Sequence, residues 1–235
     1  MSDTNNNENW LYIIRNFLKP SRTIPITSWR AESTWGLING NQSLQRFLLL
    51  IFGLSVFGIG EAFLVVTSLG NSPWVVLSEG ISLNSNLNIG QATFFVSLVV
   101  LFFWIPLRQK PGFGTLANIV VIAIGIDVGI AFIETPELFI FKLLYVFMGI
   151  GLIGIGSALY ITCALGPGPR DGWMTSLHRR SGIPVGRVRT AIEVSVLLAG
   201  WALGGRIGLG TALFALLIGY AVAAGFGVVS RLTKQ

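Results

Sequence analysis

Long apolar runs separated by short polar connections dominate the chain from residue 47 onward. The runs lie at about 47–68, 92–107, 113–133, 143–164, 190–205 and 209–230. Each run is close to the length of a helix that crosses a bilayer, about 20 residues. The pattern therefore predicts an all-α membrane protein with six transmembrane helices. Little of the chain remains for a separate catalytic domain.

The basic residues are unevenly divided between the connections. If the N-terminus is placed in the cytoplasm, the inner side receives all of the sixteen lysines and arginines except Lys142 and Arg206. Cytoplasmic loops of membrane proteins carry such an excess of positive charge. The distribution predicts that both termini are cytoplasmic.

Glycines repeat at a constant offset of 96 residues. The matched pairs are Gly53 and Gly149, Gly58 and Gly154, Gly60 and Gly156, Gly70 and Gly166, Gly90 and Gly186, Gly112 and Gly208, Gly114 and Gly210, and Gly129 and Gly225. This self-similarity predicts two three-helix repeats, at 46–133 and 142–230. Because each repeat holds an odd number of spans, the second enters the membrane in the opposite sense, as an inverted-topology repeat.

Each repeat also predicts a short extra helix after its first span. The span ends in a turn of small residues, and a proline follows at Pro73 in one copy and at Pro169 in the other. Proline is well suited to the first turn of a helix. Short helices are therefore expected at 73–82 and 169–181, at the membrane surface or dipping into it.

The first 45 residues form a polar arm. Within it, Trp10, Ile13, Ile14, Phe17 and Leu18 follow the spacing of one helix face. This spacing predicts an amphipathic helix at the membrane interface. The alternative is a partly disordered tail in which the pattern is accidental.

Composition and charge narrow the class of protein. The chain is 52% hydrophobic and only 11% charged, which is too apolar for a soluble surface. The net charge of +6 lies in the connections between spans, so nucleic acid is not an expected partner. A single cysteine, Cys163, and a single histidine, His178, offer no cluster of metal ligands, and no metal or cofactor is predicted.

A glycine-rich turn with neighbouring arginines is the strongest candidate for a binding site. Such a turn at a helix N-terminus can hold an anion through exposed N–H groups and guanidinium contacts. The candidate substrate-binding residues are Gly166, Gly168, Arg170, Asp171, Arg187 and Arg189. The alternative is that these charges only set the membrane topology and contact lipid phosphates, while Asp171 caps the short helix.

Three acidic residues fall within the predicted spans: Glu61, Asp127 and Glu193. A carboxylate inside the membrane is energetically expensive, so each is a candidate for coupling transport to a proton or cation. Two simpler roles stay open. Glu193 lies four residues after Arg189 and can pair with it, and the other two can be neutral carboxyl groups hydrogen-bonded to a neighbouring helix.

The second repeat resembles the YczE-like bacterial multi-pass membrane proteins, which are related to the YitT group. The resemblance rests on Gly-Pro-Arg-Asp-Gly at 168–172, Arg-Arg-Ser-Gly at 179–182, Val-Arg-Thr-Ala-Ile-Glu at 188–193 and Gly-Leu-Gly-Thr at 208–211. It covers about residues 46–229. It implies a bacterial plasma (inner) membrane location and no settled biochemical activity.

Inverted repeats with interrupted spans and buried carboxylates favour a secondary transporter or permease-like protein for a small, anionic solute. The competing hypothesis is a non-transporting scaffold or an accessory subunit of a membrane complex. An enzyme ranks third, because no nucleophile and base occur in a supporting context. The expected partners are membrane lipids, a small-molecule solute, and a membrane-protein partner or a second copy of the chain.

Overall fold

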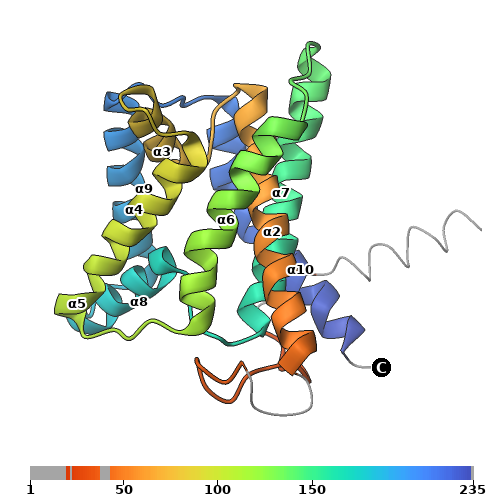
Figure 1. The fold of residues 1–235 in the computed structure, drawn as a ribbon, viewed down its shortest axis with the longest axis vertical. Helices are drawn as coiled ribbons and strands as arrows, with labels where there is room; N and C mark the ends of the chain where they lie inside the picture. Colours follow the sequence, from red (N-terminus) through yellow and green to blue (C-terminus); the bar gives the residue numbers. More distant parts are fainter. Residues whose placement is uncertain (1–19, 22, 38–42, 234–235) are drawn as a thin grey trace, which may run out of the picture.

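The computed structural model describes residues 20–21, 23–37 and 43–233, and all regular structure in this part of the chain is helical. The helices are α2 (Ser43–Thr67), α3 (Pro73–Leu83), α4 (Ile89–Phe102), α5 (Trp104–Leu107), α6 (Phe113–Phe132), α7 (Phe139–Thr162), α8 (Pro169–Ser181), α9 (Val185–Ala202) and α10 (Leu209–Leu232). Figure 1 shows them as an upright bundle. The predicted interfacial helix around residues 10–18 lies outside the described residues.

Five helical segments among the described residues are long and apolar enough to cross a membrane. They are Ser43–Thr67, Ile89–Leu107, Phe113–Phe132, Phe139–Thr162 and Leu209–Leu232. The second of these combines α4 with the short α5. The run predicted at 190–205 also forms a helix, α9, but the first half of α9 carries Arg187, Arg189 and Glu193, and α9 is not among the five.

The helix boundaries follow the same offset as the glycines. α7, α8, α9 and α10 begin 96 residues after α2, α3, α4 and α6. The turns that end the first helix of each half also match in conformation. Ser68 and Ala164 have φ of 57° and 56°, and Gly70 and Gly166 have φ of 111° and 114°. The left-handed region is open to glycine at low cost, which explains the glycine that both turns contain.

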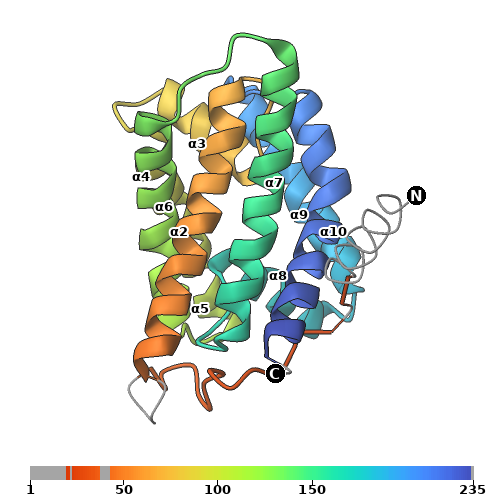
Figure 2. The same ribbon diagram turned by 90° about the vertical axis from the view of Figure 1, so that its right-hand side faces the viewer.

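α2 and α7 pack side by side and run antiparallel (Figure 2). Small residues allow their backbones to approach closely. A Cβ atom on Gly53 would lie 3.0 Å from the carbonyl oxygen of Gly156, and one on Gly60 would lie 2.8 Å from that of Gly149. α6 packs against α2, and α10 packs against α7. Close approach through small residues is a common way for helices to associate in membranes.

The short helices α3 and α8 lie near opposite ends of the bundle (Figure 1). α3 packs against α9, and α8 packs against α4, so each short helix contacts a long helix of the other half. One apolar cluster joins the four helices: Trp74, Val96, Val100, Met174, Val188 and Ile192. The halves are therefore interlocked around a common interior.

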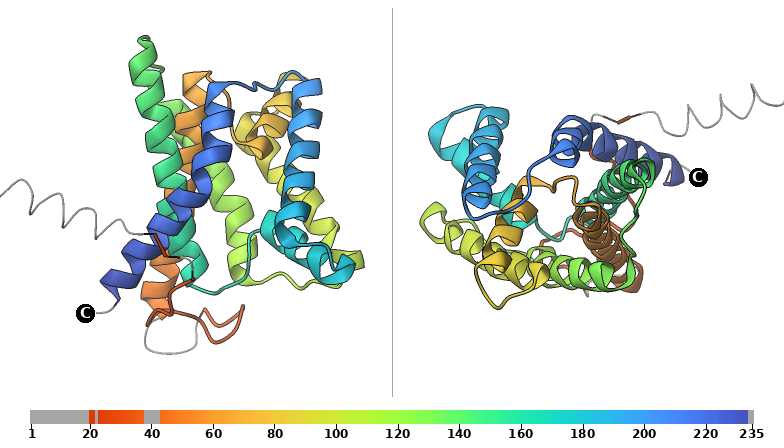
Figure 3. Two further views of the ribbon diagram at one scale, coloured as in Figure 1. Left: turned by 180° about the vertical axis from the view of Figure 1, so that it is seen from behind. Right: turned by 90° about the horizontal axis from the view of Figure 1, so that it is seen from above.

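The outer long helices differ between the halves. α4 packs along α6, whereas the equivalent pairing of α9 with α10 is not formed to a comparable extent. Figure 3 shows α9 standing apart from α10. A Cβ atom on Gly90 would clash with the Ala123 carbonyl, while one on the equivalent Gly186 would meet nothing within 4 Å.

The segment at 23–37 covers the end of the bundle at which α2 begins. Buried Arg46 holds it, donating from Nε to the carbonyl of Trp29 at 2.7 Å and from a terminal nitrogen to that of Gly36. The Ala31 N–H donates to the carbonyl of Cys163 at 2.9 Å. Residues 23–37 of the predicted 45-residue arm are therefore packed against the bundle.

Candidate functional site

A cavity of about 160 Å³ lies between the two halves of the bundle. Most of its lining residues occur in pairs that are separated by 96 positions. The pairs are Phe57 and Ile153, Glu61 and Ser157, Ser72 and Gly168, Pro73 and Pro169, Trp74 and Arg170, Thr93 and Arg189, Ser97 and Glu193, Asn118 and Phe214, and Ile122 and Ile218. Equivalent surfaces of both halves therefore face one another across the cavity.

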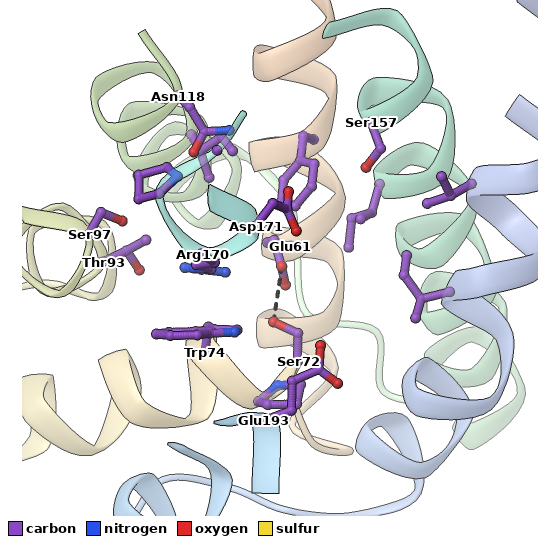
Figure 4. A pocket seen from close by; sticks show the side chains of 18 of the residues that line it. Glu61, Ser72, Trp74, Thr93, Ser97, Asn118, Ser157, Arg170, Asp171 and Glu193 are labelled. Carbon is purple, nitrogen blue, oxygen red and sulfur yellow. Dashed lines mark hydrogen bonds between the residues drawn. The ribbon is translucent and has the colours of Figure 1, made fainter. Parts of the chain in front are cut away.

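The N-termini of α3 and α8 meet at this cavity. Each helix has proline at its start, and neither has a side-chain hydrogen bond at its N-cap. The Arg170 guanidinium carbon lies 4.9 Å from the centre of the Trp74 ring, and Figure 4 shows the two groups stacked. A helix N-terminus carries a partial positive charge, so two of them converging on one space favour a negative ligand.

Arg170 is the group best placed to bind an anion. Among the described residues, its guanidinium takes part in no hydrogen bond or ion pair, and it lies over the Trp74 ring as a cation–π partner. Burial lowers the pKa of Arg170, and the nearby carboxylates of Glu61 and Asp171 oppose that change. An arginine stays protonated in proteins, so it presents a positive charge with unused N–H donors to the cavity.

Glu61 is buried beside it, with 1% of its surface exposed. Its Oε1 accepts a hydrogen bond from the Ser72 hydroxyl at 3.0 Å. Its Oε2 is buried and has no hydrogen-bond partner among the described residues. A buried carboxylate with an unpartnered oxygen is costly, which singles out this side chain as a group with a task beyond packing.

The other charged groups of the cavity are already partnered. The Tyr160 hydroxyl donates to Oδ2 of the exposed Asp171 at 3.1 Å. Arg189 and Glu193 form an ion pair of 2.9 Å along α9. The simpler pairing expected for Glu193 is thus present, and both members of that pair line the cavity.

The structure separates the remaining candidates from the cavity. Asp127 lies on α6 and its Oδ1 accepts the N–H of Gly90 at 2.8 Å, so it anchors the N-terminus of α4 and does not line the cavity. Gly166 forms the turn before α8, where a Cβ atom would lie 2.8 Å from Oγ1 of Thr115. Arg187 is exposed on α9 and is not part of the lining.

Several residues that line the cavity are not among the site residues predicted from the sequence, chiefly Trp74, Ser72 and Tyr160. The offset of 96 marks Trp74 as the counterpart of Arg170, which is the signal that could have identified it. The same offset marks Ser72 as the counterpart of Gly168. Tyr160 carries no such signal, because a single polar side chain in an apolar helix does not reveal which helix it faces. In the described part of the chain, His, Cys, Asp and Glu form no group of three that could hold a metal ion.

Comparison with known proteins gives the family. The model of a family of unknown function, DUF6198, matches residues 44–225. The chain belongs to DUF6198. This match spans α2 to most of α10 and includes every residue that lines the cavity.

Two curated proteins are similar to this DUF6198 chain over most of its length. An uncharacterized protein of Haemophilus influenzae is 41% identical over 214 residues, which cover 91% of this chain and 96% of the relative. The uncharacterized membrane protein YczE of Bacillus subtilis is 33% identical over 173 residues, covering 73% and 78%. The predicted YczE-like family is therefore confirmed, and the chain is a membrane protein. No solved structure matches it.

Proposed function

We propose that this chain is a secondary transporter or permease-like protein for a small anion in the bacterial inner membrane. One observation carries the proposal: the unpaired Arg170 guanidinium projects into a cavity at which two uncapped helix N-termini meet. Oriented N–H groups and a bidentate guanidinium are a favourable combination for holding an anion. Interrupted helices that bind solute between two repeats are typical of secondary transporters.

The proposal includes a six-span topology with both termini in the cytoplasm. In it α9 is the sixth crossing, and its Arg189 and Glu193 face the cavity. The matching helix starts and the antiparallel α2 and α7 support two inverted units, at 46–133 and 142–230. Rocking of one unit against the other then opens the cavity to each side of the membrane in turn.

Anion flux into proteoliposomes tests this function. The full-length chain is reconstituted, and uptake of radiolabelled chloride, sulfate, phosphate, lactate and succinate is measured. Arg170→Gln should lower the transported anion's rate about tenfold or more, since hydrogen bonds to charged groups contribute about 1.5–3 kcal/mol. The matched control is Arg187→Gln, an exposed arginine outside the cavity, which should stay within about twofold of wild type.

The competing class predicts a different outcome. If folded wild-type protein moves none of these anions and co-purifies with a membrane protein at fixed stoichiometry, the chain is a scaffold or accessory subunit. Equal flux in wild type and Arg170→Gln would also contradict the proposal, because the arginine would then have no part in binding.

A further inference from the structure

The lining of the cavity contains more negative than unpaired positive side chains, and this imbalance indicates which ion is transported together with the anion. Five charged side chains line it: Glu61 from α2, Arg170 and Asp171 from α8, and Arg189 and Glu193 from α9. α7 adds the titratable Tyr160, and the lining residues from α3, α4, α6 and α10 are uncharged. Because Arg189 and Glu193 neutralise one another, two carboxylates remain beside one guanidinium.

An anion bound at Arg170 would add a third negative charge to this small space. Charges a few ångströms apart repel strongly when little water screens them. Binding is therefore favoured if one carboxylate takes up a proton when the anion enters. The question is which of the two carboxylates does so.

Glu61 and Asp171 have different surroundings. Asp171 is exposed and accepts the Tyr160 hydroxyl, so its charge is stabilised by solvent and by a donor. Glu61 is buried, and its Oε2 has no donor among the described residues. A proton on Oε2 removes the unpartnered buried charge, while Oε1 keeps its hydrogen bond from Ser72.

The walls of the cavity also limit the anion. With Arg189 paired, Arg170 supplies a single free positive charge, which suits a monovalent ligand better than a divalent one. The planar guanidinium matches a carboxylate in a two-pronged contact. Phe57, Ile153, Phe214 and Ile218 form an apolar side that can accept a short hydrocarbon group.

We propose that the cavity binds a small monocarboxylate at Arg170 together with one proton at Oε2 of Glu61, and that the two cross the membrane as a pair. This rests on the transport function proposed above. A proton adds to the Glu61 carboxylate on one side and leaves it on the other, and the carboxylate ligand is bound and released unchanged. The cycle moves one negative and one positive charge, so it is electrically neutral.

Proton-coupled uptake of lactate tests the pairing. Full-length protein is reconstituted with a pH-sensitive dye in the lumen, the membrane potential is clamped with potassium and valinomycin, and initial rates are corrected for protein-free vesicles. Wild type should take up lactate with one proton each. An inside-alkaline gradient of one pH unit should drive about tenfold accumulation, because each lactate is balanced by one proton.

The Glu61→Gln variant separates coupling from transport. Glutamine keeps the size of the side chain and an acceptor for Ser72 but cannot release a proton. Lactate exchange across the membrane should therefore persist, while the pH gradient should no longer raise the lactate concentration inside above that outside. Glu137→Gln, an exposed glutamate outside the cavity, is the matched control and should accumulate lactate as wild type does. The wild-type proton-to-lactate ratio needs no variant, so the test stands even if Glu61→Gln does not fold.

Three results would overturn the inference and leave the transport function intact. They are lactate uptake without acidification of the lumen, full accumulation by folded Glu61→Gln, and faster uptake of succinate or sulfate than of any monocarboxylate. Failure of folded wild type to move any anion would instead remove the proposed function, and the inference with it.

Discussion

The two halves of the molecule share a plan and differ in what their outer helices do. In the first half, α4 docks along α6; in the second, α9 stands apart from α10, and its Arg189 and Glu193 line the cavity. The helix starts are nonetheless equivalent in the two halves. Duplicated units can thus keep their backbone geometry while their side chains diverge: the second half supplies four of the five charged groups that line the cavity, and the first half supplies Glu61.

Equivalent positions show how the difference arises. Asp127, which anchors α4, corresponds to Ala223, so α10 has no comparable acceptor for α9. Thr93 and Ser97 on α4 correspond to Arg189 and Glu193 on α9. The differences in sequence that remove an acceptor between α10 and α9, and those that place charged residues on the cavity side of α9, therefore occur on the same two helices.

The largest expected contrast is between Gly90→Leu and Gly186→Leu. A side chain at Gly90 would press on the Ala123 carbonyl and on Asp127, while Gly186 has open space around it. Overpacking of this kind costs about 3 kcal/mol, so Gly90→Leu should unfold at much lower denaturant and Gly186→Leu near wild type. Unfolding in mixed micelles, followed by tryptophan fluorescence, measures the difference. Equal losses would mean that α9 is docked as tightly as α4.

Glu79 provides the next contrast, with Thr175 at the equivalent position. Buried Glu79 accepts hydrogen bonds of 2.8 Å from Asn71 Nδ2 and from the backbone N–H of Arg206. Among the described residues, Thr175 bonds only to the carbonyls of Asp171 and Gly172 in its own helix. Glu79→Ala should lower the free energy of unfolding by about 2–3 kcal/mol and Thr175→Ala by a few tenths. Thermal unfolding in detergent measures both losses of stability. A larger loss in Thr175→Ala than in Glu79→Ala would contradict the structural role of Glu79.

Asp127→Ala tests whether this carboxylate is structural. It removes the acceptor for the Gly90 N–H and should destabilise the protein by about 1 kcal/mol, as the loss of a helix N-cap does. Anion flux per folded molecule should stay at the wild-type level, because Asp127 does not line the cavity. The rate is normalised to folded protein measured by size-exclusion chromatography. A loss of flux larger than the loss of folded protein would assign Asp127 a part in transport.

The smallest effect is expected at the ion pair on α9. Arg189 and Glu193 lie one turn apart, with side chains 50% and 28% exposed. The double variant Arg189→Gln and Glu193→Gln should change the free energy of unfolding by only about 0.3–0.5 kcal/mol. A double-mutant cycle of unfolding measurements isolates this pair, and a coupling above about 2 kcal/mol would show that it is shielded from water.

The sequence predicts the helices better than their contacts. Apolar runs near bilayer length locate α2, α6, α7 and α10, and the offset of 96 locates α3 and α8 through Pro73 and Pro169. The run containing α9 is ambiguous, because Arg187, Arg189 and Glu193 lower the hydropathy of its first half.

Only some residues of the candidate site can be predicted from the sequence. A glycine-rich turn with an adjacent arginine predicts Arg170, and a carboxylate within a span predicts Glu61. The same reasoning groups Asp127 with them, since a hydropathy pattern does not say which neighbouring helix a side chain faces. The stacking of Arg170 on Trp74 depends on how two short helices from opposite halves meet, and no local pattern contains that information.

The proposed transport function requires that the cavity can be reached from both sides of the membrane, and thiol labelling measures this. In a Cys163→Ala background, Ser157→Cys places one thiol in the cavity lining. If the cavity opens alternately to the two sides, this thiol should react with a membrane-impermeant reagent added to either right-side-out or inside-out vesicles, and more slowly when lactate is present. Reaction from one side only, unchanged by any anion, would contradict a cavity that opens alternately to the two sides.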